Sequence, residues 1–170
     1  SSAFVEDPIR VLRIARFSAR FHKFKIHPKT EALLKQIVKN KEIETVASER
    51  VWHELSVGFT EKKSYLMFEV LNRCGALKLL LPELDYPKNK NSIKRSLEYA
   101  AKYKYSTDIR AAIFFMHTYP LKVGIKCNEK IYIRLSVPNA VKKIAEKLAY
   151  WATASSSVNV AALQPSNAVI

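Results

Sequence analysis

The chain has 170 residues, of which 48% are hydrophobic and three are glycine. This length allows one medium domain or two small helical ones, and so few glycines argue against a hairpin-rich β fold or a glycine-rich phosphate loop. The net charge of +14 favours a polyanionic partner, with nucleic acid first and an anionic membrane surface second. We expect no membrane-spanning segment and no signal peptide.

The first predicted helix runs from about residue 8 to residue 22. Asp7 and Pro8 are typical of a helix start, because a carboxylate can accept from the first-turn N–H groups and proline has the backbone angle of the first position. Four arginines share roughly one third of the helix surface: Arg10, Arg13, Arg16 and Arg20. The apolar residues lie mostly opposite: Val11, Ile14, Ala15 and Phe21. Such arginines suit bidentate contacts with phosphates and base edges, and a solvated basic face is the simpler alternative.

Four more helices are expected before residue 86. One runs from Pro28 to about residue 39. The next begins at Ser48, which is expected to be its N-cap, and across one of its turns Arg50 and Glu54 could form a weak pair. A helix over residues 63–73 ends before Gly75, which suits the left-handed position after a helix. A short apolar helix over residues 76–81 follows.

A polar, basic stretch over residues 86–91 is the predicted linker, with Ser92 as the N-cap of a helix over residues 93–104. That helix has aromatic and basic residues that could stack on bases and contact phosphates, or could be half-buried tyrosines under lysine stems: Lys94, Arg95, Tyr99, Lys102, Tyr103, Lys104 and Tyr105. Further helices are expected over residues 108–117, 128–135 and 140–151. The predicted segments are therefore 1–86, 87–153 and a disordered tail over 154–170.

The cysteines and histidines do not predict a metal site. No Cys/His cluster has zinc spacing, and His22 and His27 are interpreted as ordinary surface or packing residues. Cys74 and Cys127 lie far apart in the sequence, which favours two buried, reduced thiols in the cytoplasm over a disulfide.

Three ordered sequence blocks carry a specific resemblance to a known family. Glu6-Asp7-x-x-Arg10, followed by Leu12-Arg13 and Ala15-Arg16-Phe17, resembles the EDxxR segment of class II tRNA nucleotidyltransferases that add CCA and of the related bacterial poly(A) polymerases. The resemblance continues over residues 48–55 and again over residues 70–77 and 81–85. Residues 134–139 also resemble the bacterial CCA-adding type.

The resemblance implies an all-α fold, with a helical neck over residues 1–86 followed by a smaller helical body. In that family a catalytic head before the neck holds Mg²⁺ with two carboxylates. By resemblance, Asp7 and Arg10 read the base of the incoming CTP or ATP, while Arg13 and Arg16 contact the nucleotide further out. The supporting residues are Glu6, Glu49, Arg50 and Glu54. The implied RNA partner is the 3′ end of tRNA, and the head is expected before Ser1.

Two family activities are not expected of this stretch alone. It has no Asp-x-Asp pair for metal-dependent nucleotidyl transfer, so no catalytic residue is predicted and the isolated chain is expected to be inactive. Many bacterial relatives also have an HD phosphohydrolase module, but His117 is followed by Thr118, and Lys94 lies where an earlier histidine is expected. We therefore predict no phosphohydrolase activity. The alternatives to CCA addition are poly(A) addition and a non-catalytic, basic helical RNA-binding module.

Overall fold

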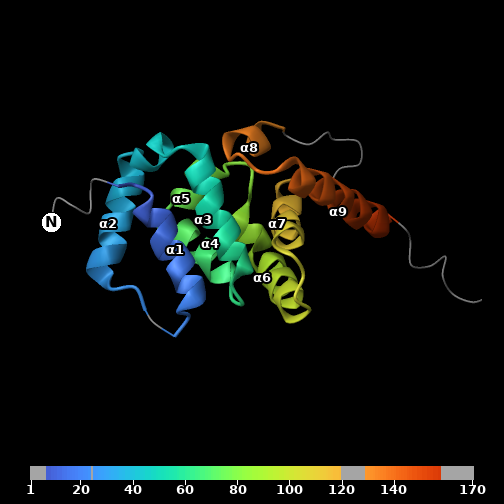
Figure 1. Ribbon diagram of the computed structural model, residues 1–170, viewed down its shortest axis with the longest axis horizontal. Helices are drawn as coiled ribbons and strands as arrows, with labels where there is room; N and C mark the ends of the chain where they lie inside the picture. Colours follow the sequence, from blue (N-terminus) through green and yellow to red (C-terminus); the bar gives the residue numbers. More distant parts are fainter. Residues whose placement is uncertain (1–6, 24, 120–128, 158–170) are drawn as a thin grey trace, which may run out of the picture.

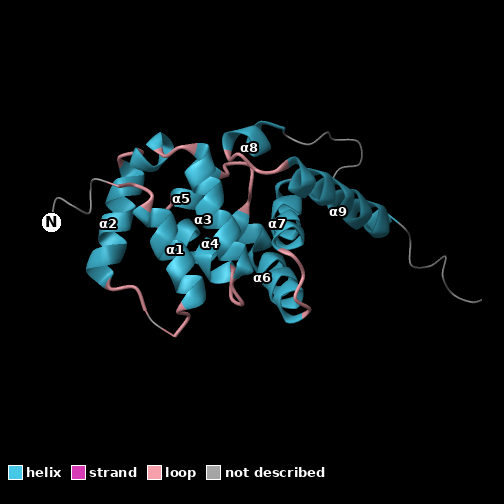
Figure 2. Ribbon diagram, viewed as in Figure 1, coloured by secondary structure: helices cyan, strands magenta, loops and turns pink. Residues whose placement is uncertain are grey.

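The described residues of the computed structural model, 7–23, 25–119 and 129–157, form helices and loops without a strand (Figures 1 and 2). This confirms the predicted all-α fold. The α-helices are α1 (Arg10–Arg20), α2 (Pro28–Lys39), α3 (Ser48–Thr60), α4 (Tyr65–Arg73), α5 (Ala76–Leu80), α6 (Tyr86–Lys102), α7 (Thr107–Phe115), α8 (Glu129–Arg134) and α9 (Asn139–Ser157). Two 3₁₀ turns are η2 (Glu42–Thr45) and η3 (Met116–Thr118).

Aromatic side chains connect the two predicted halves of the chain. Phe68 of α4 stacks on Phe114 of α7 with ring centroids 3.8 Å apart, and Phe59 of α3 lies 5.4 Å from Phe68. All three rings are fully buried, and the ring of Phe115 extends the contacts to Tyr132 of α8 at 5.7 Å. Aromatic pairs of this kind add to the stability of buried apolar area. One hydrophobic cluster therefore runs from α1 to α9. The division at residue 86 stays a prediction.

The predicted linker is wrong, because residues 86–91 form the first turns of α6. The Asp85 carboxylate caps this helix by accepting from the Lys88 N–H at 3.3 Å. Pro87 lies in the first turn, where the missing N–H has no partner to lose, and the Tyr86 side chain is buried. Ser92 is consequently inside the helix and not at its N-cap.

Other helix ends differ by a few residues from the expectations. Helix α1 begins at Arg10, and residues 7–9 form a turn, so Pro8 is not the first helical residue. The N-cap of α3 is Ala47 and not Ser48. Gly75 has the expected left-handed conformation, with φ of 86°. Helix α9 continues to Ser157, beyond the predicted start of the tail, and residues 158–170 lie outside the described residues.

Two further expectations concern burial and membranes. Cys74 is buried as predicted, and this burial raises the pKa of its thiol, whereas Cys127 lies outside the described residues. Within the described ranges, no helix is long and apolar enough to cross a membrane.

Candidate functional site

The arginine-bearing helix α1 is held in place by its apolar face, which packs on α3 and α4 (Figure 1). The buried residues of this face are Val11, Leu12, Ala15 and Ala19. The sequence interpretation missed Leu12 and Ala19, and it placed Phe21 on this face although Phe21 is 48% exposed. Because α1 is fixed along its length, its arginines keep a fixed spacing next to α3.

A buried carboxylate on α3 joins two of the four arginines. Glu54 is 5% exposed, its Oε1 accepts from the Arg13 Nε at 3.2 Å, and its Oε2 accepts from the Arg16 Nε at 2.7 Å. Arg16 is also fixed by its neighbour, since its guanidinium lies 4.6 Å from the centroid of the Phe17 ring. Charge-assisted hydrogen bonds of this kind restrict the guanidinium orientation. Glu54 therefore holds the middle of the arginine face.

A second contact from α3 reaches the turn before α1. The Arg50 Nη2 lies 3.4 Å from the Asp7 Oδ2, and the Asp7 Oδ1 accepts from the Ile9 N–H at 3.2 Å. Asp7 thus stabilises the turn before α1 and is not the N-cap residue itself. The weak pair suggested between Arg50 and Glu54 is replaced by these contacts to α1.

The predicted residues do not all meet at this site. Asp7, Arg13 and Arg16 come together with Arg50 and Glu54, and Arg10 begins α1 directly after the Asp7 turn. Glu49 instead accepts from the hydroxyl of its neighbour Ser48 at 3.3 Å. Glu6 lies outside the described residues.

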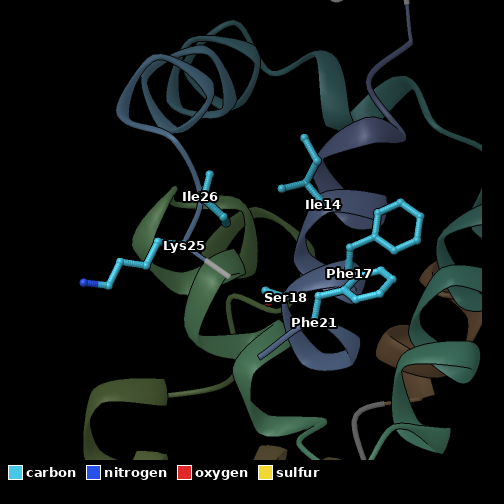
Figure 3. A pocket seen from close by; sticks show the side chains of 6 residues that line it. All are labelled: Ile14, Phe17, Ser18, Phe21, Lys25 and Ile26. Atoms are coloured by element: carbon cyan, nitrogen blue, oxygen red, sulfur yellow. The ribbon is translucent and has the colours of Figure 1, made fainter. Parts of the chain in front are cut away.

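An apolar groove of about 400 Å³ lies along the C-terminal half of α1 and the segment that follows it (Figure 3). Its lining residues are Ile14, Phe17, Ser18, Phe21, Lys25 and Ile26. The Phe17 and Phe21 rings are 42% and 48% exposed, with centroids 6.1 Å apart. Phe17 and Phe21 are four residues apart, a spacing that puts two side chains on the same side of a helix. This spacing could have predicted the exposed aromatic pair, and the sequence interpretation overlooked it.

The C-terminus of α3 is fixed by a buried cation that the sequence interpretation also missed. Arg110 of α7 is 9% exposed and its Nη1 donates to the carbonyls of Phe59 and Thr60, both at 3.1 Å. A positive charge is favourable beside the last carbonyls of a helix. Burial lowers the Arg110 pKa, but a guanidinium remains charged at neutral pH. Arg110 thereby fixes the helix that supplies Arg50 and Glu54.

Two blocks that carry the family resemblance meet where α8 contacts the loop after α5. Arg134 of α8 binds the Glu83 carboxylate with two hydrogen bonds, of 3.1 Å and 2.7 Å, and its Nε donates to the Leu80 carbonyl at 3.3 Å. This two-point contact attaches α8 to the loop after α5.

His117 lies in η3 with a buried Nε2 for which the described residues offer no hydrogen-bond partner. Among all the residues that the structure describes, no group of three or more His, Cys, Asp or Glu residues could hold a metal ion. The absence of phosphohydrolase activity stays a prediction.

Burial lowers the His117 pKa below its usual value of about 6.5. The unfolded chain therefore binds this proton at a higher pH than the folded chain does, and stability is lost as the pH falls below about 6.5. We expect His117→Gln to reduce the decline in the free energy of unfolding between about pH 7 and about pH 5, measured by urea denaturation. His53→Gln is the control, because His53 is exposed, and it should retain the wild-type decline. An unchanged decline in His117→Gln would contradict this assignment.

Comparisons with known proteins agree with the sequence resemblance. Residues 23–86 match the family model described as "Probable RNA and SrmB- binding site of polymerase A". A multifunctional CCA protein from Cupriavidus metallidurans is 38% identical over 172 aligned positions, which cover 85% of this chain and 42% of that protein. The one from Methylobacillus flagellatus is 36% identical with the same coverage. The one from Paraburkholderia phytofirmans is 54% identical over 85 residues, which cover 50% of this chain and 21% of that protein.

No solved structure matches the chain. The chain spans 42% of the length of the relatives that match most of it. The ordered motifs, the helical fold and these relatives lead to one assignment: the chain belongs to the family of CCA-adding tRNA nucleotidyltransferases and bacterial poly(A) polymerases.

Proposed function

We propose that this chain selects the incoming nucleotide and contacts the RNA in an enzyme that adds or repairs the 3′-terminal CCA of tRNA from CTP and ATP. The observation that carries the proposal is the double contact of buried Glu54 with Arg13 and Arg16. The names of the relatives, multifunctional CCA proteins, favour CCA addition over poly(A) addition. This work on tRNA would take place in the cytoplasm.

The Glu54 contacts favour a binding role over a merely solvated basic face. Each contact uses Nε–H, which is one of the five N–H donors of a guanidinium, and the other four belong to its terminal nitrogens. Guanidinium groups that are already oriented lose less entropy when they bind a phosphate or a base. We propose that Arg13 and Arg16 contact the nucleotide in this way, while Asp7 and Arg10 read its base. Arg50 and Glu54 are positioning residues.

The metal chemistry of the proposed enzyme does not fit the described residues. Nucleotidyl transfer requires carboxylates around metal ions, and no such cluster exists in the described ranges. The sequence also has no Asp-x-Asp pair. We therefore propose that Mg²⁺ is bound by the catalytic head of the family and that this chain supplies no metal ligand.

The test uses an enzyme in which this chain is joined to a catalytic head of the family, with tRNA that lacks CCA as substrate. Arg10→Ala should lower incorporation of both CTP and ATP by at least about tenfold, the effect of losing one charged contact. Arg73→Ala is the control, because Arg73 lies on α4, is 52% exposed and pairs with Glu31. The chain without a head should incorporate nothing. Incorporation by the pure chain, or an Arg10→Ala enzyme equal to the control, would contradict the proposal.

Binding of tRNA to the isolated chain should be weak and should fall steeply with salt, because 29 Lys and Arg residues face 15 acidic ones. Each phosphate contact releases counterions, so about four contacts would lower the affinity about a hundredfold between about 50 and about 200 mM salt. The measurement is fluorescence anisotropy of labelled tRNA across this range. An affinity that stays constant would contradict a phosphate-dominated interface.

A further inference from the structure

Three exposed tyrosines gather at the C-terminal end of α6, and we call them the tyrosine platform: Tyr99, Tyr103 and Tyr105. The ring of Tyr99 lies 4.5 Å from that of Tyr103 and 6.3 Å from that of Tyr105, measured between centroids. Their exposed fractions are 55%, 52% and 40%. Roughly half of each tyrosine is therefore buried, as the half-buried alternative expected, and the remainder is open to solvent.

The platform depends on an unusual end of α6. The Lys104 N–H donates to the Ala101 carbonyl at 3.2 Å, and the Tyr105 N–H donates to the Ala100 carbonyl at 2.9 Å, which is the pattern of a Schellman motif. This motif requires a left-handed residue, normally glycine, and here Lys104 occupies it with φ of 55°. The turn folds Tyr105 back beside Tyr99. Arg110 fixes the turn by donating to the Tyr105 carbonyl at 2.9 Å.

A basic groove of about 530 Å³ lies beside the platform. It is lined by four lysines, Lys62, Lys63, Lys102 and Lys104, together with Arg110 and one acidic residue, Glu98. Glu98 is neutralised by Lys63 at 3.7 Å, and the Lys102 Nζ lies 5.5 Å from the centroid of the Tyr103 ring. The groove therefore combines an excess of positive charge with adjacent aromatic faces.

We propose that the tyrosine platform and the basic groove form a second RNA site, which takes unpaired nucleotides of a single strand. Bases would stack on the tyrosines and the flanking phosphates would lie among the lysines. Stacking needs free base faces, which a duplex conceals, so single-stranded RNA is the preferred ligand. The tyrosine platform lies outside residues 23–86, which contribute only Thr60, Lys62 and Lys63 to the groove, and no residue of α1 lines the groove. The proposed site therefore does not depend on nucleotide selection by Asp7 and Arg10.

Lys104 supplies an argument against a purely structural role for this turn. A non-glycine residue in the left-handed conformation is strained, and such strain is often retained at functional sites. Glycine would relieve the strain and remove one cation from the groove. Lys104→Gly should therefore keep or raise the melting temperature while it weakens RNA binding, a combination that loss of structure cannot produce.

The test measures binding of the whole chain to a labelled single-stranded oligo(A) RNA of about 10 nucleotides and to an RNA duplex of equal length. The double variant Tyr99→Ala/Tyr103→Ala should bind the single strand at least about fivefold more weakly, with an unchanged salt slope, because stacking releases no counterions. It should bind the duplex almost as wild type does. Lys102→Ala and Lys104→Gly should each reduce the salt slope by about one.

Tyr150→Ala is the matched control, because Tyr150 is 63% exposed on α9 and does not line the groove. It should bind both RNAs as wild type does. The proposal is overturned if the tyrosine double variant binds the single strand normally, or if single strand and duplex lose affinity equally in it. It is also overturned if Lys104→Gly leaves affinity and salt slope unchanged. Each of these results would leave the Arg10→Ala experiment as an independent test of nucleotide selection.

Discussion

Glu54→Gln is expected to lower the free energy of unfolding by about 2 to 4 kcal/mol. The Glu54 carboxylate is buried and accepts from Arg13 and Arg16. A glutamine side chain has nearly the same shape, but an NH₂ group replaces one of the two carboxylate oxygens. The arginine that donates to that oxygen would then face a second hydrogen-bond donor and lose its acceptor. The Arg16 side chain is 15% exposed and would keep a poorly solvated charge without its carboxylate, whereas Arg13 at 47% would recover more hydration.

The measurement is the midpoint of urea unfolding at constant m-value. Glu31→Gln is the matched control, because the Glu31 carboxylate also pairs with two cations, Arg73 at 3.1 Å and Lys35 at 3.5 Å, but both partners are more than half exposed. Exposed pairs contribute little, so this variant should lose less than about 1 kcal/mol. Equal losses in the two variants would show that burial of Glu54 has no special consequence.

The sequence predicts those features that depend on local patterns. The helix from Pro28 to Lys39 was predicted with the correct ends, since proline at its start and an apolar stripe are local signals. The prediction of a linker over residues 86–91 is wrong because the proline and polar residues of this stretch are equally typical of a first helical turn capped by Asp85. Composition cannot separate these two readings, and the burial of Tyr86 decides between them.

Features that depend on tertiary contacts could not be predicted in this way. Glu54 lies 41 residues from Arg13 and 38 from Arg16, so no helical spacing relates them. The resemblance named Glu54 as a supporting residue but did not identify Arg13 and Arg16 as its partners. His27 was interpreted as an ordinary histidine, yet its Nδ1 accepts from the Lys29 N–H at 3.2 Å and caps α2. The tyrosine platform depends on a left-handed lysine, a position where sequence preference predicts glycine.

Asp7→Asn is expected to relax the choice of nucleotide in the enzyme that joins this chain to a catalytic head. Under the proposed function, the Asp7 carboxylate accepts from the amino group of cytosine or adenine, and the Arg10 guanidinium donates to the adjacent ring nitrogen. Uracil and guanine present a carbonyl oxygen to the carboxylate, which pairs acceptor with acceptor. Asparagine adds an amide donor that accommodates this carbonyl. Misincorporation of UTP or GTP should therefore rise between about 5-fold and about 150-fold, the equivalent of about 1 to 3 kcal/mol.

The competing interpretation is that Asp7 only stabilises the turn before α1. An asparagine oxygen can still accept from the Ile9 N–H, and the contact with Arg50 at 3.4 Å joins partly exposed groups, so Asp7→Asn should cost less than about 1 kcal/mol in stability. Arg50→Ala removes the same ion pair but leaves the carboxylate in place. If the turn alone matters, the two variants will show the same small change in all four nucleotides. Under base reading, incorporation of UTP or GTP rises only in Asp7→Asn, while Arg50→Ala keeps the preference for CTP and ATP.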